Sequence, residues 1–130
     1  MLNYIFALVM LVIVLAAHSF GLTGAYVEYG WYDIMMHILG GMGIALSVIA
    51  FLPLFKRFWM AIIKKPVRNS RRFVVGIVIF VGIVWELFEI YFNITSYPLW
   101  TKMYYLDTLK DLVDDTIGAL VVVYVFMRHN

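Results

Sequence analysis

The chain has 130 residues, of which 65% are hydrophobic and only 14% charged, and its formal net charge is +2. Soluble domains carry about a quarter charged residues, so this composition excludes an ordinary soluble protein and favours one integral membrane domain over residues 1–130. The absence of cysteine excludes disulfides and thiolate metal sites, and the composition indicates no nucleic-acid partner.

Long apolar runs predict the helices. Residues 2–20 contain no charged side chain and are long enough to cross a hydrocarbon core of about 30 Å. We interpret them as a retained first helix rather than a signal peptide, because no positively charged segment precedes them. Further helices are expected at about residues 32–52, 73–92 and 107–127. The predicted fold is therefore an all-α, integral membrane four-helix bundle.

A basic segment separates the second and third predicted helices. Residues 53–72 hold seven Lys or Arg and no acidic residue. Apolar side chains recur at helical spacing from Phe55 to Ile63, which predicts an amphipathic helix that lies in the membrane interface and ends at Pro66. Its basic side chains favour contact with anionic lipids. The positive-inside rule places this loop, and with it both termini, on the cytoplasmic side of the inner (plasma) membrane.

All eight acidic residues lie outside that basic segment, toward the predicted outer ends of the helices. Asp33 and His37 are four residues apart and share one face of a helix. Glu86 and Glu89 share a stripe on the next helix. On the last helix Asp107, Asp111 and Asp114 fall within about 60° of one another, because a helix turns about 100° per residue. Three helices are thus expected to bring polar stripes to one depth.

Carboxylates that face one another inside a membrane protein are costly unless they pair, bind protons or hold a cation. Carboxylate oxygens with one imidazole suit Mg²⁺, Mn²⁺, Ca²⁺ or Zn²⁺, so we expect a divalent metal ion. The predicted ligands are Asp33, His37, Glu86, Glu89, Asp111 and Asp114.

Three neighbours of this set are less directly implicated. Asp107 is a further candidate ligand, although a role as a helix N-cap would explain both Asp107 and Asp33. Asp115 is another candidate, although it is rotated off the aspartate stripe. Lys110 immediately precedes Asp111 in the chain and is therefore expected to point away from the stripe.

Three ordered motifs carry a family resemblance: Asp-x-x-x-His at residues 33–37, Trp-Glu-x-x-Glu at 85–89, and the segment from Asp107 to the Gly-Ala pair at 118–119. Over about the last hundred residues, this set resembles the VanZ-like and YjdF-like small membrane proteins. The chain departs from the VanZ-like pattern at Ile34, Glu89 and Asp115, and these departures favour the YjdF-like branch. The resemblance implies a polytopic inner-membrane protein of bacteria or archaea, and it supplies no reaction.

Three functions are compatible with this pattern. The first is a metal-dependent membrane hydrolase acting on a lipid-linked or envelope substrate, with Glu86 and Asp114 as the catalytic carboxylates that activate a metal-bound water. The second is a proton- or cation-coupled transporter, which with only four helices requires a homo-oligomer. The third is a structural or regulatory membrane subunit whose polar core binds no metal. The apolar cytoplasmic halves of the last two helices disfavour a continuous transport path.

Overall fold

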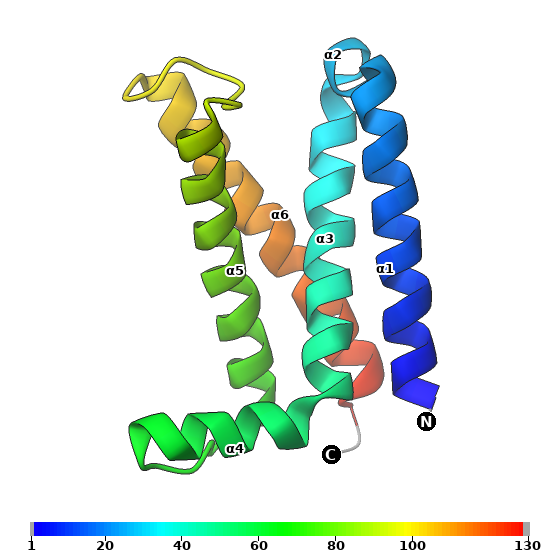
Figure 1. Ribbon diagram of the computed structural model, residues 1–130, viewed down its shortest axis with the longest axis vertical. Coiled ribbons are helices and arrows are strands. Elements are labelled where there is room, and N and C mark those ends of the chain that lie inside the picture. The colour runs from blue at the N-terminus through cyan, green and yellow to red at the C-terminus, as the bar shows by residue number, and fades with distance from the viewer. Residues whose placement is uncertain (1, 129–130) are drawn as a thin grey trace.

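The computed structural model describes residues 2–128, which are almost entirely helical and contain no β-strand (Figure 1). The terminal residues Met1 and Asn130 lie outside the described residues. The expectation that both termini face the cytoplasm therefore concerns residues that the structure does not describe. The elements in chain order are α1 (Leu2–Phe20), η1 (Gly21–Ala25), α2 (Tyr26–Glu28), α3 (Gly30–Ala50), α4 (Leu52–Ile63), α5 (Ser70–Phe92) and α6 (Lys102–Phe126).

Local capping sets the helix boundaries and corrects several expected ranges. The α5 helix begins at Ser70 rather than near residue 73, because the Asn69 side chain accepts a hydrogen bond of 3.0 Å from the Arg72 amide. The α6 helix begins at Lys102 rather than near residue 107, because Thr101 Oγ1 accepts from the Tyr104 amide at 3.3 Å. Asp107 is therefore inside the helix and does not cap it.

The ends of α3 and α4 also differ from expectation. Tyr29 is extended and α3 starts at Gly30, so Asp33 lies in the first turn and is not the N-cap. The α3 helix stops at Ala50, and α4 begins at Leu52 as a separate helix with Pro53 in its first turn. The α4 helix then ends before Pro66, because Lys64 adopts a left-handed conformation with φ of 60°.

Three segments of the described chain are long and apolar enough to cross a membrane: Tyr4–Glu28, Gly30–Ala50 and Ser70–Phe92. The α6 helix is long enough, but residues 102–115 carry four aspartates and two lysines, so this helix falls outside the set. Large apolar side chains remain exposed along all the long helices, as expected where lipid rather than water surrounds the surface. The chain is thus an all-α membrane protein.

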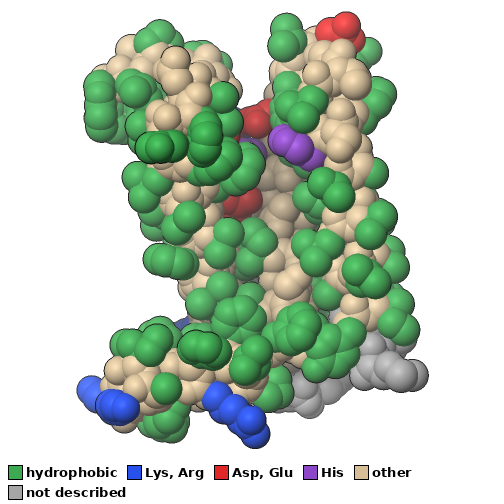
Figure 2. Space-filling view, in the orientation of Figure 1, with side chains coloured by type: hydrophobic (Ala, Val, Ile, Leu, Met, Phe, Trp, Pro, Cys, Tyr) green, Lys and Arg blue, Asp and Glu red, His purple; other side chains and the backbone are tan. Residues whose placement is uncertain are grey.

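Besides a small cluster of Ala25, Tyr32 and Met36, the described residues form one large hydrophobic core at the end of the molecule near the start of α1 and the end of α6. Four helices contribute to it, and α3 supplies the largest share. At the other end, α5 and the first half of α6 lean away from α1 and α3 (Figure 1). The space-filling view shows a cleft between these two limbs, with acidic and histidine side chains inside it (Figure 2). The fold therefore separates an apolar core from a polar cleft.

The closest helix contact in this fold joins α3 to α6 through two glycines. A Cβ atom on Gly41 would lie 2.1 Å from the Asp115 carbonyl oxygen, and one on Gly118 would lie 2.2 Å from the Ile38 carbonyl oxygen. Only glycine permits backbones to approach so closely. This contact brings the aspartates of α6 directly against the polar face of α3.

Candidate functional site

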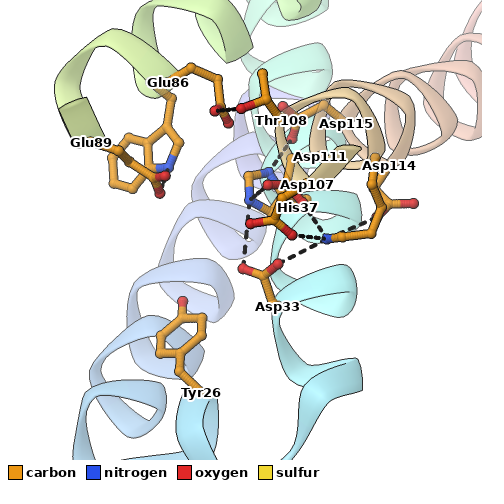
Figure 3. Close-up of polar contacts among 12 residues, drawn as sticks. Tyr26, Asp33, His37, Glu86, Glu89, Asp107, Thr108, Asp111, Asp114 and Asp115 are labelled. Atoms are coloured by element: carbon orange, nitrogen blue, oxygen red, sulfur yellow. Dashed lines mark hydrogen bonds and ion pairs between the residues drawn. The ribbon is translucent and has the colours of Figure 1, made fainter. Parts of the chain in front are cut away.

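The centre of the polar cleft is a three-residue group formed by α3 and α6 (Figure 3). His37 Nε2 lies 3.7 Å from Asp33 Oδ1 and 3.7 Å from Asp111 Oδ2. One donor atom from each of these three residues lies within 4.8 Å of the other two, which is close enough for one ion to contact all three. Asp111 is buried, whereas Asp33 and His37 are half-buried, so the group is reachable from one side.

Lys110 lies inside the cluster, which corrects the expectation that it points away from the aspartates. Its Nζ donates to Asp33 Oδ2 at 2.9 Å and makes a short contact with Asp111 Oδ1. It also lies 3.7 Å from Asp107 and 3.9 Å from Asp114. A lysine side chain is long enough to bend back across its own helix, so the direction of its Cβ does not fix the position of its ammonium group.

Asp115 lies inside the cluster although it is rotated off the aspartate stripe. Its Oδ1 is 3.4 Å from His37 Nδ1, the ring nitrogen opposite the one that faces Asp33 and Asp111. The Asp115 side chain is buried, and its Oδ2 packs against Gly82 of α5. A Cβ atom on Gly82 would lie only 2.7 Å from this oxygen. A carboxylate on the second nitrogen orients an imidazole and makes the first nitrogen a better ligand.

The two glutamates of α5 lie on the opposite wall of the cleft and outside the Asp33–His37–Asp111 group (Figure 3). Glu86 is buried and accepts a hydrogen bond of 2.6 Å from Thr108 Oγ1 of α6. Glu89 is half-buried and accepts from Trp85 Nε1 at 2.8 Å. Each glutamate therefore has its own hydrogen-bond donor. Both belong to α5, which supplies none of the three ligand atoms of the central group.

Asp114 is the least satisfied carboxylate among the described residues. Its Oδ2 is buried without a hydrogen-bond partner, and the nearest cation is Lys110 Nζ at 3.9 Å. A buried carboxylate oxygen without a donor costs free energy, because burial has removed its water. Asp107 is half-buried and shares the same ammonium group. The cluster thus has more acceptor capacity than Lys110 fills.

The formal charges within this cluster do not balance. Five aspartates contact Lys110 or His37, namely Asp33, Asp107, Asp111, Asp114 and Asp115. With one lysine, the balance is −4 if His37 is neutral and −3 if it is protonated. Such a surplus inside a membrane protein is offset by bound protons or by a bound cation.

Two participants were not predicted from the sequence. Lys110 is three residues after Asp107 and four before Asp114. This spacing is typical of ion pairs on one helix and could have predicted the contacts of Lys110 with both aspartates. Thr108 was hidden because its role depends on the packing of α5 against α6, which no local pattern encodes. The expected ligands Asp33, His37 and Asp111 come together, whereas Glu86, Glu89 and Asp114 do not join that group.

Comparison with known families gives one match. A family model described as "Predicted membrane protein (DUF2238)" matches residues 2–130. Comparisons with curated proteins and with solved structures give no match. The family description agrees with the three membrane-crossing candidates among the described helices. Because the match covers nearly the whole chain, the chain belongs to the DUF2238 family of predicted membrane proteins.

Proposed function

We propose that this chain is a metal-binding membrane protein whose site is formed by Asp33, His37 and Asp111. The observation that carries the proposal is the convergence of these three donors from α3 and α6 within 4.8 Å of one another. An ion held at about 2.1 Å by three donors keeps them roughly 3.0–3.6 Å apart. The two separations of 3.7 Å from His37 Nε2 are only slightly larger.

The position of Lys110 is compatible with a bound ion. Lys110 contacts Oδ2 of Asp33 and Oδ1 of Asp111, whereas the other oxygen of each carboxylate faces His37 Nε2. One edge of each carboxylate is thus held by the ammonium group while the other is open to an ion. Two carboxylates with one imidazole suit Zn²⁺ or Mn²⁺, and Mg²⁺ would retain more water.

The remaining acidic residues supply candidate catalytic groups. Glu86 is held by Thr108 on the opposite wall, and Asp114 has a buried oxygen with no donor. A metal ion held at this site would supply Lewis-acid activation of water for hydrolysis of a lipid-linked or envelope substrate, and Glu86 or Asp114 would act as the general base that takes the proton from that water and returns it to the departing group. Glu89 and Asp107 border the same cleft and would contact the substrate. The apolar walls of the cleft suit a substrate that enters from the lipid.

The proposed orientation follows from the charges. With α6 as a fourth crossing helix, the basic segment 53–72 faces the cytoplasm and α4 lies along the membrane surface. The cleft then opens on the extracytoplasmic side of the inner membrane. A VanZ-like or YjdF-like identity is part of this proposal, and it is supported by the order of the three motifs along the chain.

One observation favours a second candidate, a structural polar network without metal. Lys110 contacts four aspartates, and these contacts by themselves lower the cost of burying the carboxylates. In this alternative the cluster fixes the register of α3 against α6. The two candidates differ in whether His37 and Asp111 bind an added metal ion.

The test is a metal titration of the detergent-purified protein. After chelator treatment, Zn²⁺, Mn²⁺ and Mg²⁺ are titrated by calorimetry and bound metal is counted by elemental analysis. We expect one ion per chain in the wild type, and at least roughly tenfold weaker binding in His37→Gln and Asp111→Asn, since loss of a ligand costs more than loss of an outer partner. The matched control is His18→Gln, because His18 instead contacts the Tyr26 hydroxyl at 2.9 Å.

Two outcomes would contradict the proposal. One is a wild-type protein that binds none of the three ions while its thermal unfolding is cooperative. The other is a pair of variants that bind metal as tightly as His18→Gln does. Either result would leave the structural network as the function that the ion pairs support.

A further inference from the structure

A second polar feature lies at the end of the molecule opposite the acidic cleft. A hollow of about 550 Å³ is bounded by α4, by the first turn of α5 and by the end of α6. Its polar lining comes from Lys56, Arg68, Asn69, Ser70 and Arg71. This volume is in the range of pockets that hold small molecules or headgroups.

The charge of this hollow is uniformly positive. The segment 53–72 contains seven basic residues and no acidic one. Lys56 and Arg68 form no ion pair with any of the described residues, since the ion pairs found there involve Lys110 or His37. Figure 2 shows the same separation, with Lys and Arg at the α4 end and acidic side chains at the other. Among the described residues no acidic side chain neutralises Lys56 or Arg68, so the charge of both is available to an anionic ligand.

Arg71 fixes two walls of the hollow in place. Its Nη2 donates to the Met127 carbonyl at 2.5 Å and to the Arg128 carbonyl at 3.2 Å. These carbonyls follow the last turn of α6, where helix carbonyl groups lack partners within the helix. The start of α5 is thereby tied to the end of α6. The hollow is preorganised by this link, which lowers the cost of binding.

The surroundings of the hollow are apolar. On α4, Met60 and Ile63 lie within about 40° of Lys56 around the helix axis and are 44% and 45% exposed, and Trp59 packs edge-on against Phe73 of α5. The α4 helix runs across the ends of the long helices rather than alongside them (Figure 1). A helix with exposed large apolar side chains beside basic ones is typical of the membrane interface, where lipid headgroups meet acyl chains.

From these observations we propose that the hollow binds the phosphate group of an anionic phospholipid, with Lys56 and Arg68 as its principal contacts. Guanidinium and ammonium groups bind phosphate oxygens through charge-assisted hydrogen bonds. The apolar surface of α4 would contact the acyl chains of the same lipid. A soluble phosphate compound has no acyl chains and would leave this surface uncovered. This site is independent of the proposed metal centre, which lies in the other half of the molecule.

The test compares two pairs of substitutions that remove the same charge from the same segment. Lys56→Gln/Arg68→Gln changes the lining of the hollow, whereas Lys64→Gln/Lys65→Gln changes residues outside it. Each protein in neutral detergent is titrated with phosphatidylglycerol, with phosphatidylcholine and with inorganic phosphate, and bound lipid is counted by native mass spectrometry. Arg71 is left intact because it anchors α6.

We expect the wild type and the Lys64/Lys65 variant to bind one phosphatidylglycerol in preference to phosphatidylcholine. We expect the Lys56/Arg68 variant to bind it at least roughly tenfold more weakly, as loss of charge-assisted hydrogen bonds predicts. Equal loss in both variants would overturn the site in favour of the general charge of the segment. Absence of any lipid preference, or displacement of the lipid by inorganic phosphate at equal concentration, would also overturn the lipid assignment.

Discussion

At one end of the molecule five aspartates surround Lys110 and His37, and at the other end Lys56 and Arg68 line an open hollow that has no acidic side chain among its described residues. The acidic cluster is drawn together from α3 and α6. Its residues Asp111, Asp114 and Asp115 are 4%, 8% and 6% exposed, whereas Arg68 is exposed. The charges at the acidic end are therefore buried and paired within the protein, whereas the charge of Arg68 at the basic end is exposed.

The membrane orientation proposed above explains the difference by the solvent available to each end. A charge buried within a helix bundle loses its water, and it is tolerated only where partners within the protein replace that water. A charge at the membrane surface keeps its water or contacts lipid headgroups, so it needs no partner in the chain. The acidic end is thus expected to respond strongly to changes in helix packing, and the basic end to changes in its surroundings.

The largest expected effect comes from separating α3 from α6. In Gly118→Ala the new Cβ would lie 2.2 Å from the Ile38 carbonyl oxygen and 2.9 Å from the Met42 nitrogen. Both neighbours are backbone atoms, so the helices must move apart. We expect the free energy of unfolding to fall by roughly 3 kcal/mol, at the upper end for overpacked sites, measured by thermal unfolding in detergent.

The matched control for this substitution is Gly76→Ala in α5. Nothing lies within 4 Å of the Cβ position at Gly76, so alanine there should leave stability unchanged or raise it slightly. Equal stability of the two variants would show that α3 and α6 do not touch as described. The separation of the helices would also move Asp111 away from His37, so any metal binding should weaken in Gly118→Ala alone.

The next effect comes from removing the cation that the aspartates share. Lys110→Met keeps the aliphatic stem and leaves four carboxylates without their ammonium partner. Loss of a fully buried partner costs about 3–5 kcal/mol, and we expect about 2 kcal/mol here because the side chain is 35% exposed. The measurement is again the free energy of unfolding.

Lys102→Met provides the comparison for Lys110, since Lys102 lies on the same helix but is exposed and makes no ion pair with the described residues. It should change stability by less than about 0.5 kcal/mol. Added Mn²⁺ should restore part of the stability lost in Lys110→Met if the cluster accepts a metal ion. A Lys110→Met protein as stable as Lys102→Met would mean that the aspartates do not depend on this ammonium group.

The sequence was most informative where one helix carries the whole pattern. The apolar runs predicted the long helices, because their length and hydropathy are local properties. Likewise the spacing of Asp33 and His37 predicts that both lie on one face of α3, and Asp111 is one of the predicted ligands on the aspartate stripe. In the structure these three residues form the central group.

The sequence was least informative where contacts depend on packing or on long side chains. Lys110 was expected to point away, because a helical wheel records the direction of Cβ and not the reach of four methylene groups. The sequence places Asp115 off the aspartate stripe, yet the close approach at Gly41 brings it to His37. Glu86 and Glu89 were expected to join His37, but the divergence of α5 leaves them across the cleft (Figure 3).

The smallest expected effect concerns the basic end, where Arg71 is bonded to the carbonyls of Met127 and Arg128. In Arg71→Met the last turn of α6 loses its donors and should fray. The Met127 amide, which donates to Val123 at 3.0 Å, should then exchange its hydrogen roughly fivefold faster, as expected for a hydrogen bond worth about 1 kcal/mol. Arg72→Met is the control, since among the described residues Arg72 is bonded only through its backbone amide, to Asn69. The free energy of unfolding should change little in both variants, because the core around Met127 stays packed. Equal exchange rates in the two variants would mean that the end of α6 is held by its apolar contacts alone.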